Sequence, residues 1–172
     1  PFDGRRGLWE QAVGTPVTLD SFDGGPVPLR IMKTIVKLYP SQIHTQGPIG
    51  LALELRSQVP LFEIESVRVF TYRGNVSSAS TEPQKWSPST RETADHSIPY
   101  VVAVALQDGA VTPDSFGPQR MDDPTLQTLM ARVSIEEDPD FTRRFPVEFG
   151  CRMELRTESG RGLIASTSFP KG

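Results

Sequence analysis

The stretch Lys85–Gly109, KWSPSTRETADHSIPYVVAVALQDG, decides the fold of this chain. Its second half holds an unbroken apolar run, Tyr100–Leu106, which is apolar on every side rather than along one stripe. Asp95 or Ser97 can cap a helix at the start of this run, and Gly109 can end it. The pattern therefore predicts a helix that is buried on all sides, so other elements must pack around it.

Apolar residues at helical spacing predict further helices around the buried one. Pro48 and Pro124 each stand in a first turn, where the missing N–H of proline leaves no hydrogen bond unmade. Asp123 precedes Pro124 as a capping residue. The expected helices cover residues 5–13, 48–59 and 123–131.

Alternating and β-branched residues predict strands in the remaining segments. Residues 149–157 alternate most clearly, with apolar side chains on one face and arginine or glutamate on the other, and a glycine-containing turn at 159–162 follows them. The strands are expected at residues 64–72, 133–137, 149–157 and 163–169, while residues 31–38 form a strand or the approach to one. Loops are expected at residues 14–28 and 74–88, and the second is long enough to cover a site or a partner.

These elements predict an α+β fold. We expect an antiparallel sheet of about four strands, with one face in solvent and two or three helices packed on the other. A length of 172 residues suffices for one core. The content of 37% hydrophobic and 23% charged residues is typical of a globular domain.

Charge and cysteine usage narrow the function classes. The net charge is −3 and the basic residues are dispersed, so we expect no nucleic-acid partner. No stretch reaches the roughly 20 apolar residues of a membrane helix. One cysteine excludes an iron–sulfur cluster ligated by thiolates of this chain alone, and two histidines 52 positions apart disfavour a zinc site. We expect neither a metal nor a cofactor.

The first candidate site is the segment Lys37–Gln46, KLYPSQIHTQ, which leads into the helix near Pro48. Polar groups here lie beside the free amide groups of a helix start, which suits a carboxylate. His44 can act as a general acid or base near neutrality, and Lys37 can pair with a substrate carboxylate. The alternative is an ordinary loop histidine and a lysine that extends along the surface.

The second candidate site is Arg91–His96, RETADH, at the start of the buried helix. Arginine binds planar carboxylates through paired hydrogen bonds. Asp95 beside His96 suggests a carboxylate that orients an imidazole, but adjacent helical residues point about 100° apart. We therefore expect Asp95 to be the helix cap. Tyr100 follows His96 by one turn and should lie near it, and a structural role for Arg91 and His96 remains open.

Two further features are interpreted as structural. The acidic run Glu136–Asp140 lacks the ligand spacing of a calcium loop and is expected to be a solvated turn. Cys151 falls on the apolar face of a predicted strand and is expected to be a small core residue.

The string TRETADHSIPYVVAVALQDG resembles the signature segment of the MmgE/PrpD family, which includes 2-methylcitrate dehydratases, cis-aconitate decarboxylases and iminodisuccinate epimerases. The similarity extends from the opening FDGRRGLWE to the closing PKG. The segment with Pro40, His44 and Gln46 is similar to the family's second-domain active-site segment in its dehydratase form. In the decarboxylases a histidine commonly stands at the position of Gln42 or Gln46, where this chain has glutamine.

The resemblance implies a function. Residues 1–172 would form a single α+β domain, the smaller, lid-like domain of a two-domain enzyme in which a helical domain comes first. The implied enzyme is a cytoplasmic, homodimeric, metal-independent hydro-lyase of propionate metabolism that acts on a polycarboxylate such as 2-methylcitrate. Because its active site would lie between the domains, we expect the isolated domain to be inactive.

The resemblance and the two clusters together give the expected site residues. His44 and Lys37 are expected to be catalytic. The residues expected to bind substrate are Gln42, Gln46, Arg91, His96 and Tyr100. Two alternatives stay open: a decarboxylase or epimerase of the same family, and a non-catalytic binding module whose long serine-rich loop engages a partner.

Overall fold

A computed structural model describes residues 7–15, 18 and 34–171 of the chain. The chain forms two compact units, residues 1–35 and 36–172. In the first, the described residues hold a short helix, Trp9–Val13, within the range predicted as helical. The predicted loop at 14–28 lies almost entirely outside the described residues. Residues 31–38 were predicted as a strand or the approach to one, and the strand alternative is wrong for the described part, because residues 34–38 are exposed and pair with no strand.

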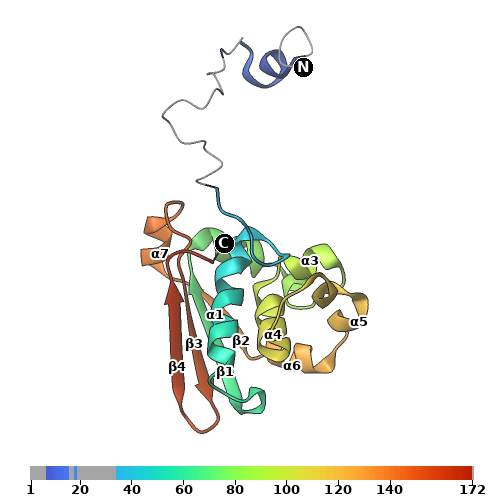
Figure 1. Cartoon of the computed structure of the whole chain (residues 1–172), viewed down its shortest axis with the longest axis vertical. Helices are drawn as coiled ribbons and strands as arrows, with labels where there is room; N and C mark the ends of the chain where they lie inside the picture. Colours follow the sequence, from blue (N-terminus) through green and yellow to red (C-terminus); the bar gives the residue numbers. More distant parts are fainter. Residues whose placement is uncertain (1–6, 16–17, 19–33, 172) are drawn as a thin grey trace. The chain divides into compact units, whose positions relative to one another are not determined.

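The second unit is built on a four-stranded sheet, whose strands are labelled in Figure 1. Its strands are β1 (Ile64–Thr71), β2 (Val133–Glu137), β3 (Cys151–Thr157) and β4 (Gly162–Thr167), in the order β2-β1-β3-β4. The pairs β1–β3 and β3–β4 are antiparallel, as predicted. The pair β1–β2 is parallel, because the helical crossover that joins these strands returns the chain to the same end of the sheet. The predicted α+β class is confirmed, with a mixed, mostly antiparallel sheet.

Two helices form the layer on one face of the sheet. Helix α1 (Gln46–Arg56) packs against β3 and β4, and α4 (Ile98–Asp108) packs against α1 and β2. Helix α6 (Pro124–Met130) packs on α4 in turn. These three match the predicted helices, and α4 is buried along most of its length, as its apolar run requires. In the described part of the chain, no helix has both the length and the apolar character needed to cross a bilayer.

Shorter helices occupy the connections. They are α2 (Arg73–Ala79), α3 (Arg91–Asp95), α5 (Pro118–Met121) and α7 (Pro139–Arg144). The loop predicted at 74–88 is therefore wrong: it contains most of α2 and a single turn, Pro83–Lys85. The local sequence has weak helical propensity in both segments. Packing buries Asn75 and Ala79 against the rest of the domain and holds α2 in place.

The core lies on both faces of the sheet rather than on one. Between the sheet and the two long helices pack Val67 and Val69 of β1 together with Met153 and Leu155 of β3. On the other face, an aromatic cluster covers the end of the sheet where β1 finishes. This aromatic cluster consists of Phe70, Tyr72, Phe141, Phe145 and Phe149. The outer face is thus solvated only in part, because α7 brings Phe141 over it.

Helices α1 and α4 run in the same direction, so their first turns lie at the same end of the domain (Figure 1). At their far ends, the Nε of Arg56 donates to the carbonyl of Leu106 at 2.8 Å. Gly109 ends α4 with φ 71°, and a Cβ there would meet the Arg56 guanidinium at 2.9 Å. Ser97 caps the start of α4 by accepting from the N–H of Tyr100 at 3.1 Å. The two candidate segments therefore come together at the opposite end.

Candidate functional site

The segment before α1 is held in shape by Gln46, which is almost fully buried. Its Oε1 accepts from the N–H groups of Leu38 at 3.0 Å and Tyr39 at 2.9 Å. Its Nε2 donates to the Tyr39 carbonyl at 3.1 Å and to the Ser41 hydroxyl at 3.0 Å. Every polar atom of this amide is engaged within the chain. Gln46 therefore positions the loop that follows Lys37 rather than facing outward.

His44 sits against the aromatic cluster, half-buried, in the single turn Ile43–Thr45 before α1. Its Nδ1 is hydrogen-bonded to the hydroxyl of Tyr72. Its ring stacks on Phe149 with 6.2 Å between centroids and 23° between planes. Its carbonyl accepts from the Nδ2 of Asn75 at 2.9 Å. Burial lowers the pKa of His44, and the charge of the nearby second histidine lowers it further.

His96 has a polar environment instead. It is the residue at which α3 ends, with φ −104° and ψ 11°, and its Nδ1 bonds to the carboxylate of Asp95 and, at 2.9 Å, to the carbonyl of Glu92. The expectation that Asp95 and His96 point apart is wrong, because the chain leaves helical geometry between them. The expectation that Asp95 caps the buried helix is also wrong: Asp95 closes α3, and Ser97 caps α4.

The two candidate segments are joined directly. The N–H of Gln42 donates to the carbonyl of Asp95 at 3.1 Å, which ties the approach to α1 to the end of α3. The two imidazoles are close enough that His96 affects the pKa of His44. Two buried oxygens beside these segments, Oε1 of Gln42 and Oδ1 of Asn75, have no hydrogen-bond partner among the described residues. They leave acceptor capacity at this end of the domain that a ligand or water can use.

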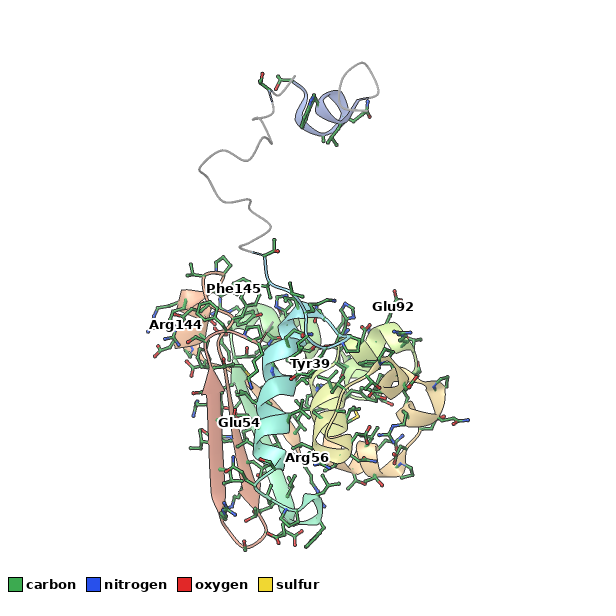
Figure 2. All side chains as sticks on the ribbon, in the orientation of Figure 1. Tyr39, Glu54, Arg56, Glu92, Arg144 and Phe145 are labelled. Carbon is green, nitrogen blue, oxygen red and sulfur yellow. The ribbon has the colours of Figure 1, made fainter. Side chains whose placement is uncertain are left out.

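Figure 2 shows Tyr39, Glu92 and Phe145 at this same end, whereas Glu54 and Arg56 lie further along α1. We call this end the histidine rim and define it by Gln42, His44, Asn75 and His96 together with Lys37. Charged and apolar side chains are both exposed in the segment that holds Lys37. Lys37 is exposed between two exposed apolar side chains, Val36 at 67% and Leu38 at 56%.

The predicted site residues Arg91, His96 and Tyr100 lie in three different surroundings. Arg91 is exposed and lines a hollow of about 440 Å³ with Asp114 and Gly117, whereas His96 lines a separate hollow of about 270 Å³ with Lys85. Tyr100 is fully buried, and its hydroxyl donates to the Ser115 carbonyl at 2.6 Å. Burial raises the pKa of Tyr100 to about 12, so its hydroxyl stays protonated.

Of the two features interpreted as structural, Cys151 behaves as expected, whereas the acidic run is not a solvated turn. Glu136 and Glu137 end β2, and Asp138 caps α7 by accepting from the N–H of Asp140 at 2.9 Å. Cys151 is buried on the inner face of β3, and burial raises the pKa of its thiol to about 12. The acidic run is paired with arginine: Glu136 with Arg68 at 3.1 Å and Glu137 with Arg73 at 3.0 Å. Within residues 7–15, 18 and 34–171, no three His, Cys, Asp or Glu side chains are grouped so as to hold a metal ion.

Three residues that contact His44 were not predicted from the sequence. Tyr72 and Phe149 surround His44, and Asn75 anchors its backbone. Tyr72 lies 28 residues from His44, so no local spacing announces the contact. The only available signal was the position of Tyr72 at the end of a predicted strand, where side chains often reach a site.

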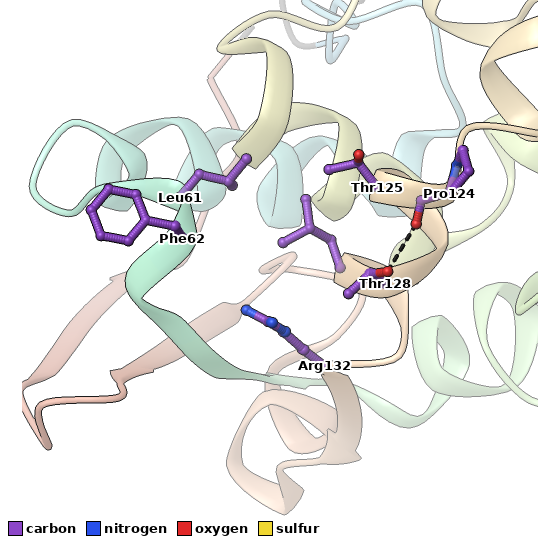
Figure 3. A pocket seen from close by; sticks show the side chains of 7 residues that line it. Leu61, Phe62, Pro124, Thr125, Thr128 and Arg132 are labelled. Atoms are coloured by element: carbon purple, nitrogen blue, oxygen red, sulfur yellow. Dashed lines mark hydrogen bonds between the residues drawn. The ribbon is translucent and has the colours of Figure 1, made fainter.

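A larger hollow than those lined by Arg91 and His96 lies elsewhere, near the start of β1, and is shown in Figure 3. It measures about 550 Å³ and is lined by Leu61, Phe62, Pro124, Thr125, Thr128, Leu129 and Arg132. Two of its polar side chains are already used: the Thr128 hydroxyl donates to the Pro124 carbonyl at 2.9 Å, and Arg132 bonds to the carbonyl of Ile64. It holds no acid or base suited to proton transfer, so the histidine rim is the better candidate site.

The fold and the rim define an α+β domain that presents imidazoles beside two helix starts, and comparison with known proteins gives its family. The model of the MmgE/PrpD C-terminal domain matches residues 39–172. The chain belongs to this family. Lys37 lies two positions before the matched range, whereas the remaining predicted site residues lie inside it.

Two curated relatives show what the chain resembles. It is 27% identical to the 2-methylcitrate dehydratase of Cupriavidus necator over 112 residues, which cover 62% of this chain and 22% of that protein. It is 30% identical to the cis-aconitate decarboxylase of Mus musculus over 73 residues, which cover 42% of this chain and 15% of that protein. The matched region thus spans about a fifth or less of either relative. The family includes dehydratases and decarboxylases.

Proposed function

We propose that this chain is the smaller, lid-like domain of a metal-independent lyase resembling 2-methylcitrate dehydratase, and that it supplies acid–base and carboxylate-binding residues to a site between two domains. The observation that carries the proposal is the histidine rim. There a half-buried His44 with a lowered pKa lies beside His96, within the region that matches the family. Perturbed titratable groups beside helix starts are typical of active sites.

The chemistry of dehydration explains why these residue types are suited to the task. A base must remove a proton next to a carboxylate, an acid must help the hydroxyl leave, and cations must hold the remaining carboxylates. We assign the acid–base role to His44 and a catalytic role to Lys37, whose ammonium offsets charge on the substrate. His96 and Arg91 are proposed to bind carboxylates. Gln42 contributes an amide whose Oε1 is unpaired.

For Gln46 and Tyr100 the proposed contribution is indirect. Gln46 holds the loop between Lys37 and His44, and Tyr100 is buried within the first turn of α4. Both residues support the geometry of the rim instead of contacting substrate in this conformation.

The exposed apolar surface beside Lys37 supports the proposal that a second domain is present. Val36 and Leu38 place apolar area in solvent on both sides of the proposed catalytic Lys37. Apolar side chains around a polar centre are typical of a surface that another element covers. We propose that a helical domain of the same enzyme covers this surface and completes the acid–base set, and that the enzyme is a homodimer.

The proposal is tested by assaying the two-domain enzyme with 2-methylcitrate, citrate and cis-aconitate, following alkene absorbance and released carbon dioxide. We expect alkene formation from a hydroxy-polycarboxylate, and a raised KM for Lys37→Met. The 172-residue chain alone should be inactive. Turnover by this chain alone at an ordinary enzymatic rate, on the order of 10 per second, would overturn the shared site.

Decarboxylation is the second candidate, favoured by the similarity to the cis-aconitate decarboxylase. The glutamines at positions 42 and 46 argue against it, since Gln46 is fully engaged in holding the loop and offers no titratable group. Release of carbon dioxide from cis-aconitate in the same assay would favour this reading. An epimerase would interconvert stereoisomers without alkene or gas. A non-catalytic binding module would bind partners but turn over none of these acids.

A further inference from the structure

We propose that Tyr72 fixes the tautomer of His44, so that the Nε2 of the neutral ring carries the proton and His44 acts as a hydrogen-bond donor. The proposal deepens the proposed function. It rests on that function only for the role of the His44 Nε2–H toward a substrate. Two observations carry it: the contact between the Tyr72 hydroxyl and the His44 Nδ1, and the burial of that hydroxyl.

The position of Tyr72 is rigidly determined. It follows β1, is 1% exposed, and belongs to the aromatic cluster. Its ring stacks on Phe145 with 4.4 Å between centroids and 14° between planes, and meets the edge of Phe149 at 5.9 Å and 88°. Phe145 and Phe149 hold the Tyr72 ring in the orientation in which its hydroxyl reaches His44. Among the described residues, its only hydrogen-bond partner is the Nδ1 of His44.

The direction of this hydrogen bond follows from burial. Burial raises the pKa of Tyr72 far above its usual value, so the phenol keeps its proton at neutral pH. If Nδ1 of His44 carried a proton, it would donate to the phenol oxygen, and the buried phenol O–H would lack an acceptor. Leaving a buried donor unpaired is costly. The stable arrangement has the Tyr72 hydroxyl donating and Nδ1 accepting.

The remaining groups around His44 keep its ring neutral. Phe145 and Phe149 bring no charge, and Cys151 beyond Tyr72 is a buried thiol with a raised pKa. Burial lowers the pKa of His44, and the electrostatic influence of His96 lowers it further. In a neutral imidazole whose Nδ1 accepts, the proton sits on Nε2. Nε2 makes no hydrogen bond to the described residues, so it is available to a substrate oxygen.

His96 shows the opposite arrangement. Its Nδ1 faces two acceptors, the carboxylate of Asp95 and the carbonyl of Glu92, so Nδ1 carries the proton. The two histidines of the rim therefore present different nitrogens. In the proposed dehydration, the Nε2–H of His44 donates to the hydroxyl that leaves the substrate, which is the acid part of the acid–base role proposed for this residue.

The test is a long-range ¹H–¹⁵N NMR experiment on the ¹⁵N-labelled 172-residue chain at pH 7.5. Because the chain has two histidines, the spectrum of His96→Gln assigns both rings. We expect a protonated Nε2 and a bare Nδ1 for His44. In Tyr72→Phe, the proton should distribute over both nitrogens. Thr157→Val removes another buried hydroxyl, one that bonds to the Arg161 carbonyl at the opposite end of β3, and should leave His44 unchanged.

Two outcomes overturn the proposal: a protonated Nδ1 on His44 in the unaltered chain, or ring shifts that Tyr72→Phe does not alter. The first is decided without any variant, so a Tyr72→Phe chain that fails to fold does not block the test. In the two-domain enzyme, Tyr72→Phe should also move the acidic limb of the pH–rate profile to higher pH, because the neutral ring loses its donor. The NMR result needs no turnover, so an inactive enzyme would sink the proposed function and leave the tautomer assignment standing.

Discussion

The two histidines of the rim stand in contrasting surroundings. His44 is enclosed by the aromatic cluster, with its Nδ1 against the Tyr72 hydroxyl and its ring on Phe149. His96 stands at the end of α3 with its side chain 43% exposed and its Nδ1 against the carboxylate of Asp95. The hydrogen bond from the Gln42 N–H to the Asp95 carbonyl joins the two segments that carry these histidines. One end of the domain thus offers an imidazole tuned by burial and an imidazole oriented by a carboxylate.

The contrast shows that position along the sequence does not decide which histidine has a shifted pKa. Both stand just before a long helix, and the sequence made them look alike. The difference arises from the elements packed on each side. The strand end and the segment after α7 bring aromatic rings to His44, whereas α3 brings only its own backbone and carboxylate to His96.

The largest effect on this contrast should come from Gly150→Ala. A Cβ at Gly150 would lie 2.2 Å from a ring carbon of Phe141, so the aromatic cluster must shift. We expect a loss of about 1–3 kcal/mol in the free energy of unfolding, as for other overpacked cores. Urea denaturation measures it. Gly162→Ala is the matched control, because nothing lies within 4 Å of the added Cβ. The NMR signals of His44 should move in Gly150→Ala, whereas those of His96 should not.

A loss of the same order should follow from Gln46→Ala. The variant removes the acceptor of the Leu38 and Tyr39 N–H groups, and each lost hydrogen bond contributes about 1 kcal/mol. Hydrogen exchange at these two amides should quicken, while exchange in α4 stays slow. Gln84→Ala serves as the control, because its amide bonds only to an exposed glutamate, Glu82. Unchanged exchange at Leu38 and Tyr39 would show that Gln46 does not hold the loop.

The lowered pKa of His44 predicts a pH dependence of stability. Above the unfolded-state pKa of about 6.5 the ring is neutral in both states and contributes nothing. Below that pH the unfolded chain binds a proton that the folded chain resists, so stability falls until the pH passes the lower, folded-state pKa. Urea midpoints between pH 7.5 and 5.5 should fall less steeply for His44→Gln than for the unaltered chain. Equal slopes would rule out a lowered pKa.

The smallest effect should come from His96→Gln. Removing the like charge should raise the pKa of His44 slightly, because burial, the larger cause, is unchanged. An NMR titration of the His44 ring measures this shift. Arg91→Gln removes a charge that faces a different hollow and should leave the titration unaltered. A lowered pKa in His96→Gln would mean that the two rings do not influence one another as described.

The sequence predicted elements whose causes are local. Ser97 and Gly109 bound α4, Asp123 caps α6 by accepting from Thr125 at 2.8 Å, and β3 alternates between its two faces. The strand β2 was predicted, but its parallel pairing with β1 was not, because pairing direction depends on how a long crossover returns. Helix α2 was missed because its serine-rich sequence has weak helical propensity and is held by packing.

The candidate site followed the same division. His44, His96 and Lys37 were identified from residue type and resemblance, and the two histidines were found together at one end of the domain. The surroundings that separate them could not be predicted. Tyr72 reaches His44 from a strand, and Asp95 reaches His96 only because α3 ends between them. Contacts between distant segments and breaks in helical geometry leave no periodic signal.

The central claim is that His44 performs acid–base work while His96 supports binding, and kinetics of two variants test it directly. In the two-domain enzyme, His44→Ala should lower kcat by about 100-fold or more, the usual contribution of an acid–base group. His96→Ala should mainly raise KM and leave kcat within about tenfold. Near-normal kcat in His44→Ala, or an equal loss of kcat in both variants, would contradict the account.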